Sequence, residues 1–370
     1  MAQKIYEAAL VGCGRIGYSL GLDKKREQPA SHTMALNDNS RIRLVAGCDR
    51  DPLTLTEWHN ANKKTLIYRD SADLYARQKL DIVTIAVNES SHEREAINAI
   101  VSNPSLVILE KPVALNIKEA LRIQSEAERN NVPVLVNHER RFAEDYKIAG
   151  EYIKNIGSLQ SIDAKLSSSL CVYNPNEEDS GAYSLIHDGT HLVDAVLYFL
   201  EGEKPSTVRE AAGKGGLLNR ALSANGEVKL ENSILNNPAI TGFYKDSKGL
   251  VRSLNAHYKT DACPDVNIYI NGASRFFDFE IIITGTEGRV CIGNGFLKCY
   301  KREESKLYTG FYSLTADKDI KPPKKTLYFA NMVQNAVDFL DGIAPLKSTL
   351  QTGINALTVL EEIKNKIVKL

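Results

Sequence analysis

The sequence predicts an α/β fold of two domains, with a doubly wound parallel sheet in residues 1–136 and an open, mainly antiparallel sheet with helices in residues 137–370. Up to residue 136, short apolar runs alternate with helical segments, as in consecutive βαβ units. Beyond His138 the strands become longer and alternate apolar with polar residues, which is typical of a sheet with one open face. The length of 370 residues also suits two domains.

The first domain is expected to begin with a strand at Tyr6–Val11. The apolar run at Asp81–Val87 (DIVTIAV) is rich in β-branched residues, as a strand buried on both faces requires. In a sheet of this kind, ligands bind at the carboxyl ends of the strands. Further strands are predicted at Arg41–Cys48, Thr65–Tyr68, Leu106–Leu109 and Val132–Val136, and helices at His32–Asn37, Pro52–Ala61, His92–Val101 and Ala114–Asn131.

The turn after the first strand reads GCGRIG over residues 12–17, a G-x-G-x-x-G pattern. Gly12 permits a tight turn, Gly14 lets the backbone approach phosphates, and Gly17 allows close packing of the following helix. Asp49, at the end of the second strand, is placed to accept hydrogen bonds from ribose hydroxyls. The pattern therefore predicts a site for a dinucleotide.

The spacing within this motif is unusual, because Asp49 follows Gly17 by 32 residues where about 20 is common. The polar stretch Tyr18–Ser31 contains Pro29 and has no helical periodicity, so we interpret it as an inserted loop. Arg50 either lies on the surface, stacks on adenine or meets a 2′-phosphate. We expect NAD as the cofactor, with NADP as the alternative.

The second domain is predicted from long alternating strands and one conspicuous helix at Tyr183–Leu200. Glycine turns such as Asn225-Gly226 separate the strands. Two helices near Ala330–Leu340 and Thr349–Val368 close the chain and are candidates to pack back on the first domain. The strands are expected at Leu159–Leu170, Gly249–His257, Val266–Asn271 and Phe276–Thr284.

The composition is that of an ordinary globular protein, with 43% hydrophobic and 25% charged residues. The 46 basic residues balance the 46 acidic ones, which argues against nucleic acid or a membrane surface as a partner. The N-terminus lacks a signal-peptide pattern, and no apolar run approaches the roughly 18 residues of a membrane span. The six cysteines lack metal-type spacing, so we expect packed, reduced thiols in a cytoplasmic protein.

Lys111 is the first candidate for chemistry. It stands in Glu110-Lys111-Pro112, directly at the carboxyl end of a buried strand. An ammonium group at that place could polarise a hydroxyl or carbonyl oxygen. A surface lysine that opens a helix is an equally good interpretation of the residue alone.

The second candidate is the sequence HDGTH in the predicted helix at 183–200. His187 and His191 are four residues apart and would share one face of that helix, with Asp188 about 100° away. A histidine that takes the hydroxyl proton is what alcohol oxidation requires. The alternatives are an H-x-x-x-H metal pair, which lacks a third ligand nearby, and two solvated histidines.

Taken together, these segments resemble the Gfo/Idh/MocA (glucose–fructose oxidoreductase / inositol dehydrogenase) family over nearly the full chain. The Glu-Lys-Pro motif, followed later by a G-x-H-x-x-D helix, is specific to that family. The matching segments are GCGRIG at 12–17, VAGCDRDP at 45–52, LEKPVALN at 109–116, VNHERRFAEDY at 136–146, HDGTHLVDAVLYFL at 187–200 and ITGTEGRVCIGN at 283–294.

The resemblance implies a Rossmann domain, a second domain whose open sheet mediates oligomerisation, and NAD(P)-dependent chemistry. It implies that Lys111 is the catalytic lysine, that His191 exchanges the substrate proton with help from His187 or Asp188, and that Glu110 supports the lysine. The implied cofactor-binding residues are Gly12, Gly14, Arg15, Ile16, Gly17, Asp49, Arg50, Val87, His92, Glu110 and Lys111. The implied substrate-binding residues are Lys111, Arg141, His187, Asp188 and His191, and no metal is expected.

The sequence departs from the family pattern at three places. The family aspartate four residues before the histidine is His187 here, with Asp188 displaced by one position. The family Thr-Pro after the buried strand is Val87-Asn88, and the insertion Tyr18–Ser31 is unusual. Because loops at strand ends carry specificity, these departures indicate a subfamily with its own substrate.

The resemblance implies an oxidoreductase that oxidises a ring hydroxyl of a sugar or nucleotide sugar to a ketone, and the 3-hydroxyl of UDP-N-acetylglucosamine is one candidate. The alternatives are a polyol or inositol dehydrogenase, an NAD-dependent glycosidase, and a non-catalytic NAD-binding sugar sensor. The expected partners are the small-molecule substrate and further copies of the chain, as a dimer or tetramer.

Overall fold

The computed structural model describes residues 3–201, 221–222, 228–229 and 233–370. These residues form two compact units. The first unit consists of residues 3–142, the described part of 205–229, and 327–354. The second consists of residues 143–201, 233–326 and 355–370.

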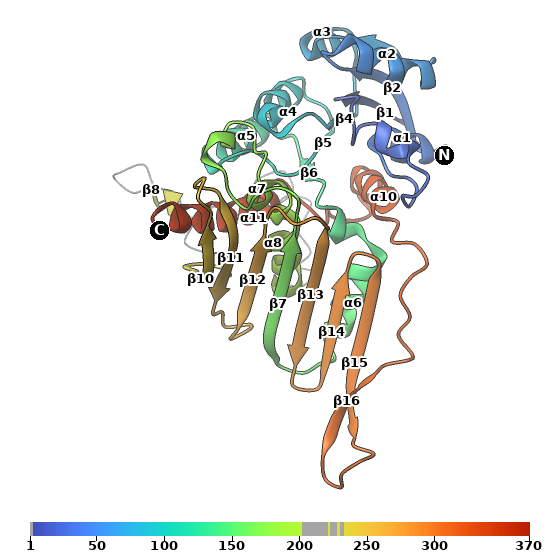
Figure 1. Ribbon diagram of the computed structural model, residues 1–370. Helices are drawn as coiled ribbons and strands as arrows, with labels where there is room; N and C mark the ends of the chain where they lie inside the picture. Colours follow the sequence, from blue (N-terminus) through green and yellow to red (C-terminus); the bar gives the residue numbers. More distant parts are fainter. Residues whose placement is uncertain (1–2, 202–220, 223–227, 230–232) are drawn as a thin grey trace. The chain divides into compact units, whose positions relative to one another are not determined.

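A six-stranded parallel sheet with the order β3-β2-β1-β4-β5-β6 is the centre of the first unit (Figure 1). The order runs outward in both directions from β1, so the predicted doubly wound sheet is confirmed. Its strands are β1 (Tyr6–Val11), β2 (Ile42–Cys48), β3 (Leu66–Tyr68), β4 (Ile82–Ile85), β5 (Leu106–Leu109) and β6 (Val134–Val136). Its helices are α1 (His32–Asp38), α2 (Pro52–Ala61), α3 (Ser71–Arg77), α4 (His92–Val101), α5 (Ile117–Asn130) and α10 (Tyr328–Leu340).

Local sequence signals explain where several of these helices begin. The Asp51 side chain accepts hydrogen bonds from the first turn of α2, and Pro52 occupies the first helical position. Asn116 caps α5 in the same way, so this helix begins three residues later than the predicted Ala114. The sequence analysis missed α3, a helix of seven residues that Asp70 caps.

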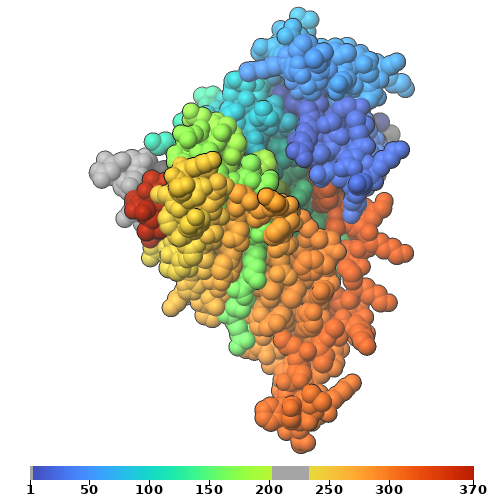
Figure 2. All heavy atoms as spheres, viewed as in Figure 1, coloured from blue at the N-terminus to red at the C-terminus, as the bar shows by residue number. Residues whose placement is uncertain are grey.

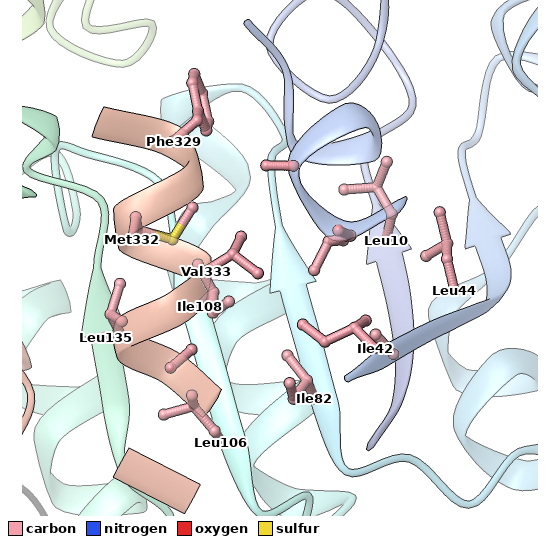
Figure 3. Close-up of a cluster of buried hydrophobic side chains, with 14 of the residues drawn as sticks. Leu10, Ile42, Leu44, Ile82, Leu106, Ile108, Leu135, Phe329, Met332 and Val333 are labelled. Atoms are coloured by element: carbon pink, nitrogen blue, oxygen red, sulfur yellow. The ribbon is translucent and has the colours of Figure 1, made fainter. Parts of the chain in front are cut away.

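Helix α10 supplies part of the core of the first unit although it lies near the C-terminus. Its buried residues Met332 and Val333 lie beside Leu135 and Ile108 of the parallel sheet (Figure 3), and Phe329 belongs to the same buried cluster. Burial of such side chains contributes roughly 1.5–3 kcal/mol each. Helix α10 is therefore an integral part of the first unit.

The insertion Tyr18–Ser31 interrupts the connection between β1 and α1. Its one regular element is the short 3-10 helix η1 (Ser19–Leu22). Beyond the insertion, the N–H of His32 donates to the carbonyl of Ile16 at 3.1 Å, and the N–H of Thr33 donates to the carbonyl of Gly17 at 2.9 Å. Helix α1 is thus joined to the end of the glycine turn by helix-like hydrogen bonds that bridge the loop.

The second unit contains an eight-stranded sheet with the order β10-β11-β12-β7-β13-β14-β15-β16. Only the pair of β12 and β7 is parallel, which confirms a mainly antiparallel sheet. The helices α6 (Glu144–Ile153) and α8 (Gly189–Glu201) pack against it. The strands are β7 (Leu159–Ser167), β10 (Ala239–Lys245), β11 (Val251–Tyr258), β12 (Val266–Asn271), β13 (Asp278–Gly285), β14 (Gly288–Gly293), β15 (Phe296–Glu304) and β16 (Tyr312–Ala316).

One predicted element of the second unit is wrong. The expected helix at Tyr183–Leu200 is two helices, α7 (Ser184–His187) and α8, with Asp188 between them. The N–H of His191 donates to the carbonyl of Asp188, three residues back, so the regular four-residue hydrogen bonding is broken there. His187 and His191 therefore do not share the face of one continuous helix.

Several predicted strands have different ends in the structure, such as β7, which ends at Ser167 and not at the predicted Leu170. Other elements were not predicted at all. Helix α6 and the strands β10, β15 and β16 were not predicted, and the helix α11 (Leu350–Val368) agrees with its expected range. The turn predicted at Asn225-Gly226 lies outside the described residues. The loop between β15 and β16 stands clear of the surface of this unit (Figure 2). None of the helices in the described ranges combines the length and apolar character needed to cross a membrane.

Candidate functional site

The glycine turn after β1 has the conformation that its sequence predicted. Gly12 has a φ of +95°, and a Cβ there would lie 2.3 Å from the carbonyl oxygen of Ala86. A Cβ at Gly17 would lie 2.0 Å from the carbonyl oxygen of Gly12. By contrast, a Cβ at Gly14 would meet no atom within 4 Å. Gly12 and Gly17 are thus required by the fold of the turn, whereas Gly14 borders open space.

Asp49 holds this turn against the end of β2. One carboxylate oxygen accepts a hydrogen bond from the N–H of Cys13 at 2.8 Å, and the other accepts from the N–H of Asp51 at 3.0 Å. A carboxylate oxygen can accept a second hydrogen bond, so these contacts leave room for ribose hydroxyls. The neighbouring Arg50 is exposed and lies 3.9 Å from the buried carboxylate of Glu95.

His92 connects the turns that follow β4 and β5. Its Nδ1 lies 2.6 Å from the carbonyl oxygen of Pro112, and its Nε2 lies 3.1 Å from the carbonyl oxygen of Val87. The ring is 1% exposed, and this burial lowers the pKa of His92. His92 thus fixes the backbone beside Lys111, and a direct contact of His92 or Val87 with a cofactor stays a prediction.

Glu110, the last residue before Lys111, lies at the centre of a buried polar network. Its Oε1 is 2.6 Å from Nε2 of His32 and accepts a hydrogen bond from the Asn137 side chain, also at 2.6 Å. Its Oε2 accepts a hydrogen bond from the N–H of Lys111 at 3.2 Å. Burial by itself raises the pKa of Glu110, but the hydrogen bond and the charge interaction with His32, the charge of Lys111 and the hydrogen bond from Asn137 outweigh it and hold that pKa below its usual value.

Lys111 is half-buried directly beyond β5, at the carboxyl edge of the parallel sheet. The turn after the neighbouring strand β6 carries Asn137 and, among its other polar residues, the two arginines Arg140 and Arg141. These arginines are only 9% and 8% exposed, although arginine is seldom buried without a function or a partner. The structure therefore gathers the glycine turn, Asp49, the Glu110–Lys111 motif and Arg141 on strand ends of one sheet, as the sequence predicted.

The histidines of the second unit lie at the break between α7 and α8. His187, Asp188 and His191 are each half-buried. Asp188 accepts a hydrogen bond from the Ser168 hydroxyl at 2.5 Å, which fixes its carboxylate on the end of β7. Asp194, one turn beyond His191, is 1% exposed. The roles expected for these residues stay predictions.

His32 is a member of the Glu110 network that the sequence analysis identified only as the start of a helix. The signal was its position, because a histidine opens the helix immediately after the insertion. Its side chain is fully buried and meets the Phe329 ring edge-on, with the ring centroids 5.1 Å apart.

The described residues show no other cluster with obvious chemistry. Within the described ranges, no three His, Cys, Asp or Glu side chains gather as metal ligands. The six cysteines, all of which are described, are free thiols. Burial raises the pKa of Cys48 to about 12, which makes this thiol unreactive at neutral pH.

Comparison with a protein-family model agrees with this geometry. Residues 6–138 match the family described as "Oxidoreductase family, NAD-binding Rossmann fold". Among curated proteins, the chain is 27% identical to a D-apiose dehydrogenase of Paraburkholderia graminis over 152 residues, which are 41% of this chain and 37% of that protein. The matches span between 37% and 61% of the length of the first three curated relatives.

Solved structures resemble the whole fold. A putative NADPH-dependent oxidoreductase from Desulfitobacterium hafniense has a TM-score of 0.76 and 14% identity, over 100% of this chain and 97% of that one. An oxidoreductase from Agrobacterium radiobacter, solved with NAD⁺, L-tartaric acid and magnesium, has a TM-score of 0.69 and 14% identity, over 98% and 97% of the two chains. At this identity the likeness establishes the fold alone.

Proposed function

We propose that the chain, which belongs to the Gfo/Idh/MocA family of oxidoreductases, oxidises a hydroxyl group of a sugar or polyol with a nicotinamide cofactor. The observation that carries this proposal is the buried Glu110 network, which holds Lys111 at the carboxyl edge of the sheet that also bears the glycine turn. A structural lysine would need no such network of buried polar groups.

The residues of the first unit fit an NAD molecule. The open space beside Gly14 lets a pyrophosphate approach the backbone, and the Asp49 carboxylate stands at the end of β2, where ribose hydroxyls would lie. Arg15 and Ile16 complete the turn, and Arg50 would lie beside the adenine. The negative charge of Asp49 disfavours a 2′-phosphate, which supports NAD over NADP.

The chemistry divides between two kinds of residue. Lys111 donates a hydrogen bond to the substrate oxygen and so stabilises negative charge that develops there. His191 accepts the hydroxyl proton, with His187 or Asp188 orienting the substrate or the proton path. A bound nicotinamide cofactor would supply the acceptor for the hydride that leaves the carbon bearing this hydroxyl, so that the net products would be a ketone, the reduced cofactor and one proton.

The substrate class is the finer part of the proposal. Arg141 is buried at the strand ends, and the insertion presents three consecutive exposed cations, Lys24, Lys25 and Arg26. These charges support a phosphate-bearing substrate such as a nucleotide sugar, for which UDP-N-acetylglucosamine is one candidate. A polyol dehydrogenase, an NAD-dependent glycosidase and a sugar sensor are the other candidates from the sequence.

The test is a screen of free sugars, polyols, and UDP- or GDP-sugars for reduction of NAD and NADP, read at 340 nm. We expect one substrate class to reduce NAD, with the rate lost in Lys111→Met and in His191→Asn. Tight NADH binding without turnover on any compound would contradict an oxidoreductase and favour a sensor. Release of an aglycone without net NADH would indicate the glycosidase.

Two further expectations concern the assembly and its place in the cell. We propose a dimer or tetramer through the open sheet face of the second unit, where half-buried residues such as Tyr269 and Ile282 alternate with the buried ones of β12 and β13. Light scattering after gel filtration tests this, and a monomer at about 10–50 μM, a concentration above a dissociation constant of roughly 1 μM, would contradict it. A cytoplasmic location stays a prediction.

A further inference from the structure

We propose that His32 is a positioning residue, which ties the Lys111 loop to the glycine turn through the carboxylate of Glu110. The inference rests on the proposed function, in which Lys111 touches the substrate and the glycine turn holds the cofactor. His32 itself touches neither, since its side chain is fully buried.

The backbone of His32 provides the first half of this connection. Its N–H donates to the carbonyl of Ile16, inside the glycine turn, at 3.1 Å. The next residue, Thr33, donates both its N–H and its hydroxyl to the carbonyl of Gly17, at 2.9 and 2.7 Å. The position of His32 is therefore set by the turn, although the insertion separates the two in sequence.

The side chain provides the second half. Nε2 of His32 lies 2.6 Å from Oε1 of Glu110, and because a carboxylate can only accept, Nε2 carries the proton. Nδ1 has no hydrogen-bond partner in the described part of the chain. The edge-on contact with Phe329 fixes the plane of the ring. The imidazole is thus held as a donor to Glu110.

The Glu110 carboxylate, held in this way by His32, in turn holds the backbone of Lys111. Oε2 of Glu110 accepts from the backbone N–H of Lys111, while Asn137 donates to the same oxygen as His32. The titratable groups around Glu110 are His32, Lys111 and His92. Burial raises the pKa of Glu110, and the hydrogen bond from His32 lowers it. Without this hydrogen bond the pKa of Glu110 would be higher, so the carboxyl would take up a proton at a higher pH. The negative charge beside Lys111 would then be lost.

The experiment compares His32→Leu, which removes the donor, with His32→Gln, whose amide can donate to Glu110. Met34→Leu, in the same helix, is the matched control. For the unloaded proteins, the rate of Lys111 acetylation by acetic anhydride at pH 5–7 is measured against that of the exposed Lys118, by peptide mass spectrometry. For the loaded proteins, NADH affinity and the pH dependence of kcat are measured.

We expect His32→Leu to acetylate at Lys111 at least about threefold faster relative to Lys118, because the Lys111 loop loses its tie to the glycine turn and becomes more mobile. We also expect kcat to fall about tenfold or more, with the acidic limb of its pH profile moved upward and NADH affinity within about threefold of wild type. His32→Gln should restore both readouts, and Met34→Leu should change neither.

Equal acetylation ratios in wild type and His32→Leu would overturn the proposal, as would a His32→Gln protein that behaves like His32→Leu. Far-UV circular dichroism and NADH binding identify a variant that has not folded, in which case the His32→Gln comparison decides. If the wild type binds NADH but oxidises no sugar while the acetylation difference persists, the proposed function fails and the positioning role stands.

Discussion

Thr33 donates both its backbone N–H and its side-chain hydroxyl to the carbonyl oxygen of Gly17, across an interval of 16 residues. In an α-helix the residue that donates to a carbonyl lies four positions later. The helix therefore behaves as if 12 of the intervening residues were absent. Subtracting these 12 from the 32 residues between Gly17 and Asp49 leaves 20, the spacing common in dinucleotide-binding turns. The insertion thus lies outside an otherwise ordinary cofactor-binding motif.

A deletion of residues 18–29 that joins Gly17 to Ala30 should fold. Ala30 and Ser31 are buried, and Ser31 caps α1, so both are retained, whereas residues 22–26 are all exposed. We expect the free energy of unfolding to change by less than about 2 kcal/mol and NADH affinity by less than about fivefold. Urea denaturation measures the free energy of unfolding, and fluorescence titration measures the NADH affinity. Loss of folding would show that the loop, whose Glu27 accepts a hydrogen bond from the N–H of Leu327, is structural.

Alanine at the first two glycines of the turn should separate stability from cofactor binding. Gly12→Ala places a Cβ 2.3 Å from a backbone oxygen at a φ of +95°, so we expect a loss of about 2–4 kcal/mol in unfolding free energy. Gly14→Ala meets no protein atom, so stability should change by less than about 1 kcal/mol while NADH affinity falls at least about tenfold. If Gly14→Ala bound NADH like wild type, the pyrophosphate would not approach the turn.

The charge of Asp49 should decide between the two nicotinamide cofactors. Asp49→Asn keeps an oxygen that can accept from the N–H of Cys13 but removes the negative charge that would repel a 2′-phosphate. We expect the ratio of NADP to NAD affinity to rise about fivefold to tenfold, as roughly 1 kcal/mol of repulsion is relieved. Titration of both cofactors into wild type and variant checks this. Equal ratios would place the 2′ position of the ribose away from Asp49.

Burial of His92 should make stability depend on pH between about 7 and 5. Burial lowers the pKa of His92 in the folded protein below the unfolded value of about 6.5, so the unfolded chain binds the additional proton. The stabilisation is complete above the unfolded pKa and is lost as the pH falls toward the folded pKa, by at most about 1.4 kcal/mol per pH unit. In His92→Gln the free energy of unfolding should change less with pH over this range. Urea denaturation at pH 5, 6 and 7 measures it, and parallel curves would contradict a neutral His92.

Much of the first unit could be predicted because its signals are local. The strands β4 and β5 are buried along their whole length and appear in the sequence as continuous apolar runs. The glycine turn and Asp49 could be found from their residue types and from the number of residues between them, once the inserted loop is left out of that number. The break between α7 and α8 at Asp188 was not predicted. The Asp188 side chain there accepts a hydrogen bond from Ser168, 20 residues away in the sequence, and helical periodicity gives no information about a contact over that separation.

The sequence by itself determined the parallel sheet, the glycine turn and the place of Lys111 beyond a buried strand, because strand patterning, glycine geometry and short motifs depend on neighbouring residues. The tertiary structure alone decided that His32 and Asn137, 78 and 27 positions from Glu110, converge on one buried carboxylate. It also decided that α10 completes the core of the first unit. The reason is physical: a buried charge must be satisfied by donors wherever the fold brings them, and no local pattern encodes that meeting.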